Sequence, residues 1–309
     1  MRVTVGLFVC IVWASVMVAQ DAGEENKDAT SDWMKFYAQR AEQYEMGLEG
    51  DDRKLELFPT TLLQYTNPER GRQQHGAVFL WTLEGVPQAI GTIWSITDLK
   101  DAAVRRVTHE FHSLSQRDLW AQRPPAVEER MNVNRQVGAW NPKGPGIEFQ
   151  QVQPEGKIAQ TAVARLIQMR HLAGQFEASA IARQDQSNVP LRFLRSPLTR
   201  YSAAEQGIVD GCIFAYVVGT DPELFLVIEC RRDEDGQLAW YFAPARFTGL
   251  ALRLRHQNKE VWRCDPLVVR TANDPYSLTF GVTVLPADFP VEKKQLPETS
   301  PDVPQTSTP

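Results

Sequence analysis

The densest group of side chains with chemistry of their own is the run from His109 to Ser113, which also contains Glu110 and His112. Histidine, glutamate and serine are the residues of hydrolytic acid, base and nucleophile sites, and histidine and glutamate also bind metals. On a strand, Glu110 and His112 share one face and His109 lies on the other. That spacing brings at most two ligands to one point, and no Gly-x-Ser-x-Gly turn exposes Ser113. A polar strand face is favoured, and a hydrolase-type enzyme using this strand is the alternative.

Four further residues are candidates for ligand binding. Trp81 and Trp94 belong to a chain with 8 tryptophans, and exposed tryptophan faces bind sugars and peptides, although most aromatic side chains pack in cores. Asp221 lies in a predicted hairpin turn at residues 219–222, and Glu223 follows it. Glu229 lies further along the same hairpin, where an ion pair with an arginine is a better explanation than catalysis.

The sequence contains no pattern for a metal or cofactor. Phosphate loops, dinucleotide glycine patterns, zinc cysteine pairs and EF-hand loops are all missing from it. Beyond the N-terminal apolar run the cysteines are Cys212, Cys230 and Cys264, an odd number that cannot be fully paired. Cys212 and Cys230 flank the predicted hairpin turn, so a disulfide between them and three buried thiols both stay open. We expect no cofactor and no metal.

The elements that position these residues occur twice. Residues 55–94 and 191–229 align with an offset of 191 − 55 = 136, which becomes 211 − 76 = 135 after a single deletion. Such self-similarity is the signature of a repeated architecture. Matched residues include Leu62/Leu198, Tyr65/Tyr201, Gly76/Gly211, Phe79/Phe214 and Ile93/Ile228.

A shared core is enough to explain the matched apolar residues. Any specific function is therefore expected where the two copies differ. At the 135 offset, Asp221 replaces Val86 and Glu223 replaces Gln88.

Each copy is predicted to begin with a helix, because apolar residues recur at helical spacing over residues 32–46 and 158–182. Short strands follow, and residues 76–83 are apolar on both faces, which indicates a strand covered on both sides. Gly236 lies in a second hairpin turn that needs a positive φ. The prediction is an α+β fold: an internally duplicated unit of one helix followed by a curved antiparallel sheet, two copies in tandem with a pseudo-twofold relation. The strands are expected at residues 55–58, 62–65, 76–83, 88–96, 104–114, 191–194, 198–201, 211–218, 223–231, 238–243, 250–254, 261–264 and 277–284.

The chain divides into five segments. Residues 1–19 are an apolar run followed by acids, typical of a signal peptide, although a retained membrane anchor has a similar length. Residues 20–30 form a flexible leader, residues 31–153 the first repeat unit and residues 154–287 the second. Residues 288–309 are rich in proline and are expected to be disordered. Because residues 1–19 resemble a signal peptide, we expect an exported protein, periplasmic or extracellular.

The charge of the chain bears on its partners. The formal net charge is −5 and no long basic run occurs, so nothing favours nucleic acid. The expected partner is an envelope protein, a peptide or a glycan. A membrane contact is expected only through an uncleaved signal.

Four segments carry a resemblance. Residues 165–178 and 210–223, together with 67–71 and 109–114, resemble a group of uncharacterised exported proteins of planctomycete-type bacteria. The resemblance covers most of the chain after the signal. It implies export, and because no activity is known for the group, it implies no functional residues.

The residues indicate a class of function and no specific ligand. We expect an exported, non-catalytic binding or scaffolding protein of the periplasm or cell envelope. Its site is expected at the cleft between the two copies, because ligand pockets favour domain interfaces.

Overall fold

The computed structural model describes residues 30–67, 73–123, 140–152, 156–232, 235–268 and 271–290. Strands make up 52% of it and helices 13%, arranged as several curled sheets. The predicted α+β class, with a helix-then-sheet duplication, is therefore wrong, and the fold is mostly β. The residues of the predicted signal peptide, almost all of the predicted leader and most of the proline-rich tail lie outside the described residues.

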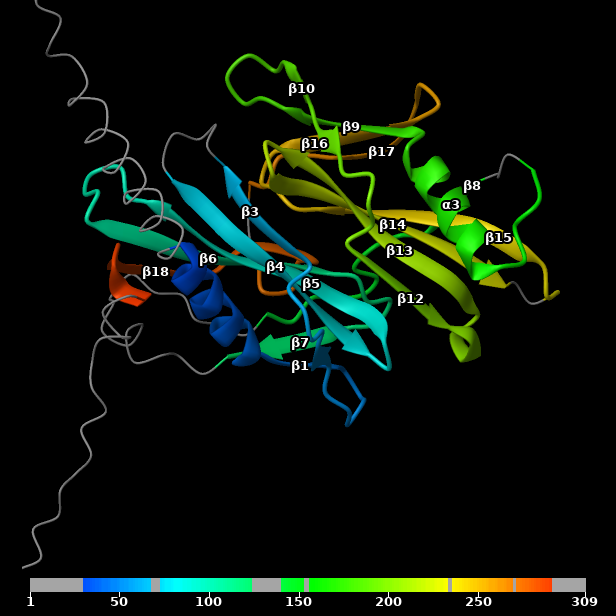
Figure 1. The fold of residues 1–309 in the computed structure, drawn as a ribbon, viewed down its shortest axis with the longest axis horizontal. Helices are drawn as coiled ribbons and strands as arrows, with labels where there is room; N and C mark the ends of the chain where they lie inside the picture. Colours follow the sequence, from blue (N-terminus) through cyan, green and yellow to red (C-terminus); the bar gives the residue numbers. More distant parts are fainter. Residues whose placement is uncertain are drawn as a thin grey trace, which may run out of the picture.

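The first large sheet, called sheet 1, has the strand order β18-β6-β5-β4-β2, with β3 also paired to β4 (Figure 1). All of these pairs are antiparallel. The strands are β2 Glu56–Leu57, β3 Leu63–Asn67, β4 Gln74–Leu83, β5 Val86–Thr97, β6 Val104–Ser113 and β18 Tyr276–Pro286.

The second large sheet, called sheet 2, has the order β11-β13-β14-β15-β8, with β12 also paired to β13. A short 3-10 helix, η2 Ala204–Gln206, joins β12 to β13. The strands are β8 Gln150–Val152, β11 Arg192–Phe193, β12 Thr199–Ala203, β13 Ile208–Val218, β14 Asp221–Arg232 and β15 Leu238–Arg246.

In sheet 1 the long strands β4, β5 and β6 are neighbours in chain order, and in sheet 2 β13, β14 and β15 are arranged in the same way. Each sheet also contains one strand from the other half of the chain. β18 pairs with β6 in sheet 1, although it follows all the strands of sheet 2. β8 precedes those strands and pairs with β15 in sheet 2. The segments 31–153 and 154–287 therefore each contribute a strand to the other's sheet.

Two smaller sheets lie outside these. One pairs β1 Glu45–Leu48 with β7 Leu119–Gln122. The other has the order β10-β9-β16-β17. Its strands are β9 Phe176–Ile181, β10 Asn188–Pro190, β16 Ala251–His256 and β17 Lys259–Cys264.

Both predicted helices are shorter than expected, because the second part of each is a strand. The first helix occupies residues 30–42 and is followed by β1. The second, α3, runs Ala162–Ala173, with the Thr161 hydroxyl accepting from Ala164 N and Gly174 at its C-terminus. Beyond it Phe176, Ala178 and Ala180 are all buried in β9. Phe176 and Ala180 fit both a helical spacing of four and a strand spacing of two, which is why the sequence pattern extended the helix.

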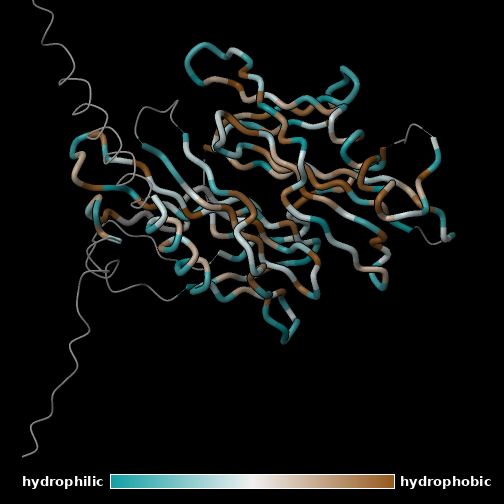
Figure 2. Tube along the Cα trace, viewed as in Figure 1, coloured by the Kyte–Doolittle hydropathy of each residue, from teal (hydrophilic) through white to brown (hydrophobic). Residues whose placement is uncertain are grey.

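Three apolar cores hold the sheets together, and Figure 2 shows apolar residues along their strands and hydrophilic residues in the loops. Helix 30–42 packs on one face of sheet 1, against Phe79 and Trp81. α3 packs on one face of sheet 2, against residues such as Phe214. Between the sheets, Val78 of β4 and Ile213 of β13 share the third core. Every residue of β4 is buried, so the expected two-sided cover of residues 76–83 is confirmed.

Cys212, Cys230 and Cys264 are free thiols. In the ladder between β13 and β14, Cys212 lies opposite Ile228 and Cys230 lies opposite Asp210, so the two thiols do not face each other. No helix in the described residues is long and apolar enough to span a membrane.

Candidate functional site

Two matched glycines, Gly76 and Gly211, each leave room for a tyrosine ring. A Cβ atom at Gly76 would lie 2.7 Å from Cζ of Tyr65, and one at Gly211 would lie 2.7 Å from Cζ of Tyr201. Only glycine lets each tyrosine ring lie flat over the neighbouring strand. On the next strand, Trp94 lies opposite Gly76 and Glu229 lies opposite Gly211.

Trp94 lines a cavity of about 560 Å³ between the sheets, which we call the acidic cavity. Sheet 1 contributes Trp94 and Glu110, and the start of β14 contributes Asp221 and Glu223. Arg183, beyond the end of β9, also lines it. Three of the four residues predicted to bind a ligand therefore meet at one site, together with Glu110 of the polar strand.

Glu110 is 6% exposed and holds two hydrogen bonds. The Tyr276 hydroxyl donates to Oε1 at 2.5 Å and the Trp94 indole N–H donates to Oε2 at 3.1 Å. Burial raises the pKa of Glu110 well above the usual value of 4.5, with Asp221 and Glu223 adding to the rise and the two hydrogen bonds opposing it. Glu110 is thus biased towards the neutral acid.

Asp221 is fixed by a contact between the tip of one hairpin and the other sheet. The backbone N–H of Thr66 donates to the Thr220 hydroxyl, which in turn donates to the Thr66 carbonyl. Asn67 and Gln74 donate their side-chain amides to Asp221 Oδ2, at 3.1 and 2.8 Å. Within the described structure, the buried amide oxygens of Asn67 and Gln74 accept no hydrogen bond. The neighbourhood of Asp221 is therefore rich in acceptors.

The polar side chains of residues 109–113, which the sequence analysis proposed as candidates, lie in different environments. His109 lies on the helix-facing side, where its Nδ1 is 2.7 Å from the Tyr44 hydroxyl, and burial holds its pKa well below the usual value. Nδ1 of His112 donates to the Ser113 carbonyl at 2.8 Å, and burial lowers the pKa of His112 to about 4. The Ser113 hydroxyl is buried and has no partner in the described structure. Of these residues only Glu110 lines either cavity between the sheets.

Trp81 is not at the site. It is 1% exposed and packs in the core under helix 30–42.

Metal binding finds no support in the described residues either, since none of their His, Cys, Asp and Glu side chains form a group of three or more that could hold an ion.

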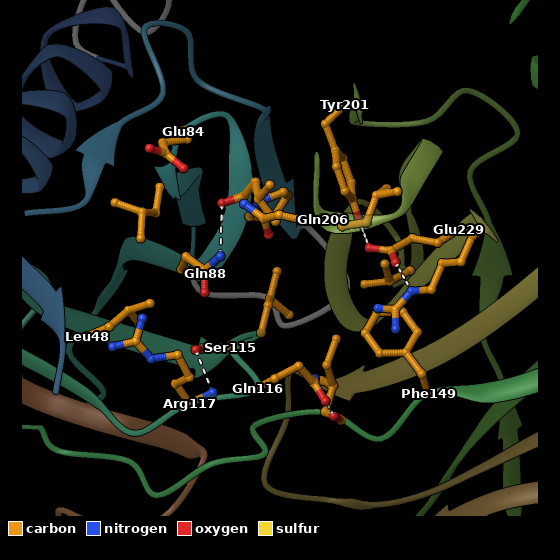
Figure 3. A pocket seen from close by; sticks show the side chains of 18 of the residues that line it. Leu48, Glu84, Gln88, Ser115, Gln116, Arg117, Phe149, Tyr201, Gln206 and Glu229 are labelled. Atoms are coloured by element: carbon orange, nitrogen blue, oxygen red, sulfur yellow. Dashed lines mark hydrogen bonds and ion pairs between the residues drawn. The ribbon is translucent and has the colours of Figure 1, made fainter. Parts of the chain in front are cut away.

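Glu229 lines a second cavity of about 330 Å³, which we call the paired-charge cavity (Figure 3). The Tyr201 hydroxyl donates to one Glu229 oxygen at 2.5 Å, and Arg231 Nε donates to the other at 2.5 Å. The expected ion pair of Glu229 with an arginine is confirmed. The Arg231 guanidinium also lies 3.7 Å from the centre of the Phe149 ring, a cation–π contact.

Comparison of the chain with protein-family models, curated proteins and solved structures finds no match. The resemblance to planctomycete-type exported proteins stays a prediction.

Tyr276, Gln74 and Gln88 are among the residues at the sites that sequence reasoning missed. Tyr276 reaches Glu110 from β18, and Gln74 reaches Asp221 from β4. Gln88 lines the paired-charge cavity. The pairings of Tyr276 and Gln74 depend on which strands and sheets become neighbours, so no local pattern marks them. Gln88 had a signal, since it is the counterpart of Glu223 in the alignment of the two copies.

Proposed function

We propose that this chain is an exported, non-catalytic binding protein that holds a small cationic ligand in the acidic cavity. The apolar run at residues 1–19 supports export. The ligand class follows from the charges, the acceptors and the aromatic side chains around the cavity.

One observation carries the proposal: carboxyl groups from both sheets converge on a single cavity. Among the described lining residues are the carboxyl groups of Asp221 and Glu223, the Glu110 carboxyl, which is biased towards the neutral acid, and the Arg183 guanidinium. That guanidinium donates to the Gly249 carbonyl at 3.1 Å, so part of its hydrogen-bonding capacity is already used. Carboxylates in a cavity with low-dielectric walls concentrate negative potential there and favour a positively charged guest.

The other walls fit the same ligand class. Trp94 is half-buried at the cavity, and Phe247 also lines it. Aromatic faces attract cations within about 6 Å of the ring centre. Gln74 also lines the cavity, and its amide oxygen accepts no hydrogen bond within the described structure. A ligand with N–H donors suits such surroundings. Small-molecule pockets typically measure about 300–1,000 Å³, a range that includes this cavity.

A matched set of probes tests the proposal. Benzamidine, benzamide and benzoate have nearly the same shape and differ in charge. We expect benzamidine to bind the acidic cavity and to quench Trp94 fluorescence, with its affinity measured by calorimetry. Glu223→Gln should weaken benzamidine about tenfold, a change of roughly 1.4 kcal/mol. The control Glu84→Gln removes an exposed acid outside this cavity and should leave the affinity unchanged.

The opposite result is equally clear. If benzoate binds the acidic cavity as tightly as benzamidine, the cation proposal fails. It also fails if Glu223→Gln and Asp221→Asn both bind benzamidine as the unmodified protein does.

A hydrolase-type activity is the second candidate, and the raised pKa of Glu110 favours it. A neutral carboxylic acid beside other carboxylates is the arrangement by which some enzymes separate a proton donor from a base. On that hypothesis the unmodified protein hydrolyses p-nitrophenyl esters or glycosides, and Glu110→Gln does not. If the unmodified protein turns over neither class while it binds benzamidine, the hydrolase hypothesis is excluded for these substrates.

A further inference from the structure

We infer that the paired-charge cavity is a second ligand site of different chemistry, which takes a neutral small molecule with an apolar body and an amide-like polar edge. The inference goes beyond the cation site, because other residues carry it.

The two cavities are built reciprocally. In the acidic cavity the β13–β14 hairpin, with Asp221 and Glu223, meets Trp94 of sheet 1. In the paired-charge cavity the β4–β5 hairpin, with Gln88, meets Glu229 of sheet 2. The offset of 135 that aligns the two copies places Gln88 on Glu223 and Trp94 on Glu229. Positions that align in the sequence therefore line two different cavities and carry different side chains.

The charges of the paired-charge cavity are balanced within the protein. Glu229 bonds Arg231, and Arg53 bonds Glu84 at 2.5 Å. Arg117 bonds Asp51 at 3.1 Å. These ion pairs include every charged side chain among the described residues that line the cavity. A charged guest would lose its hydration without gaining a counter-ion, whereas a neutral guest does not incur that cost.

The remaining walls define the shape and polarity of the guest. Gln88 and Ser115 lie across the cavity from Tyr201 and Glu229 (Figure 3). The Gln88 amide donates only a long 3.3 Å bond to the Val86 carbonyl, and it offers both a donor and an acceptor. The Ser115 oxygen accepts from Arg117 N at 3.0 Å, and its O–H can still donate. Apolar side chains complete the walls: Leu114, Ile147 and Val227.

The test uses the same three probes at the second cavity. The side-chain amide resonance of Gln88, assigned from a Gln88→Leu variant, reports binding by ¹H–¹⁵N NMR. We expect benzamide to shift this resonance and the two charged probes to shift it at least tenfold more weakly at equal concentration. In calorimetry, which does not depend on that resonance, Gln88→Leu should weaken benzamide at least fivefold. Gln88→Glu should weaken the binding of benzamide and strengthen the binding of benzamidine, because it introduces at position 88 the acid that the aligned residue Glu223 has.

Controls separate this site from the acidic cavity. Glu223→Gln should leave benzamide binding at Gln88 unchanged, so the cation proposal can fail while this one stands, and the reverse also holds. Melting curves show which Gln88 variants stay folded, and Tyr201→Phe is a second variant on the opposite wall that should also weaken benzamide. The inference is overturned if benzamide binds equally to the folded Gln88→Leu and Tyr201→Phe variants, or if benzoate or benzamidine shifts Gln88 as strongly as benzamide.

Discussion

The hydroxyl of Tyr276 donates a 2.5 Å hydrogen bond to Oε1 of Glu110, although 166 positions separate the two residues. β18 brings Tyr276 to this position by pairing with β6, where Tyr276 lies opposite His112. The guanidinium of Arg246 lies 5.2 Å from the centre of the Tyr276 ring. β18 therefore holds the buried acid of the acidic cavity and lowers its pKa.

Replacing Tyr276 should change the acidity of Glu110. The Tyr276 bond lowers the Glu110 pKa and so opposes the effect of burial. Tyr276→Phe removes that donor, and we expect the Glu110 pKa to rise further. The measurement is a ¹³C NMR titration of the Glu110 carboxyl. Tyr241→Phe, whose ring lies beside Arg231, is the control and should leave the titration in place. A fall in the Glu110 pKa in Tyr276→Phe would contradict the assignment.

The raised pKa of Glu110 should also appear in the pH dependence of stability. Because the folded state holds this proton more tightly than the unfolded chain, the stabilising contribution is complete below the usual pKa of 4.5. It is lost as the pH rises through the folded pKa. Glutamine at this position cannot ionise, so Glu110→Gln does not undergo this loss. As the pH rises above 4.5, the free energy of unfolding of the variant should therefore increase relative to that of the unmodified protein. Urea unfolding at a series of pH values measures the difference, and a constant difference across that range would contradict the buried acid.

The matched glycines should tolerate no side chain. A Cβ atom at Gly76 would lie 2.5 Å from the Trp94 Cβ atom, closer than van der Waals contact allows. We expect Gly76→Ala and Gly211→Ala each to cost about 1–3 kcal/mol of folding free energy, the range for overpacked cores. Gly174→Ala is the control, because its nearest contact would be 3.3 Å and its φ is −70°. Chemical denaturation measures all three, and equal stability of Gly76→Ala and Gly174→Ala would show that the tyrosine ring can move aside.

A buried ion pair next to α3 should be a stability hot spot. Asp210 accepts from Arg165 Nε at 3.0 Å and from Arg200 at 2.7 Å. Breaking a buried pair leaves an uncompensated charge, so Asp210→Asn should cost about 3–5 kcal/mol. The exposed pair of Asp118 with Lys143 is the comparison, and Asp118→Asn should cost less than about 1 kcal/mol. Thermal melting of both variants measures the loss of stability. Similar losses in the two variants would show that the Asp210 pairs stabilise the fold no more than an exposed ion pair does.

The strands and turns were largely predictable from the sequence, because their signals are local. Residues 76–83 and 88–96 lie within β4 and β5. The turn between these strands has positive φ at Glu84 (53°) and Gly85 (79°). Gly236 has a φ of 78°, which confirms the predicted need for a positive value. Strand alternation and turn residues act over a few positions, so a single sequence is enough to locate them.

The fold class and the composition of the sites were decided only by the tertiary structure. Ala180 satisfies both a helical and a strand period, and its burial in β9 follows from packing on the core of sheet 2. The sequence by itself determined that Glu223 and Gln88 are unequal counterparts. Tertiary structure decided that Glu223 lies with Glu110 around one cavity and that Tyr276 holds Glu110 in place. Such contacts join residues more than one hundred positions apart, and their free energy depends on the neighbours that burial brings together, which no local pattern encodes.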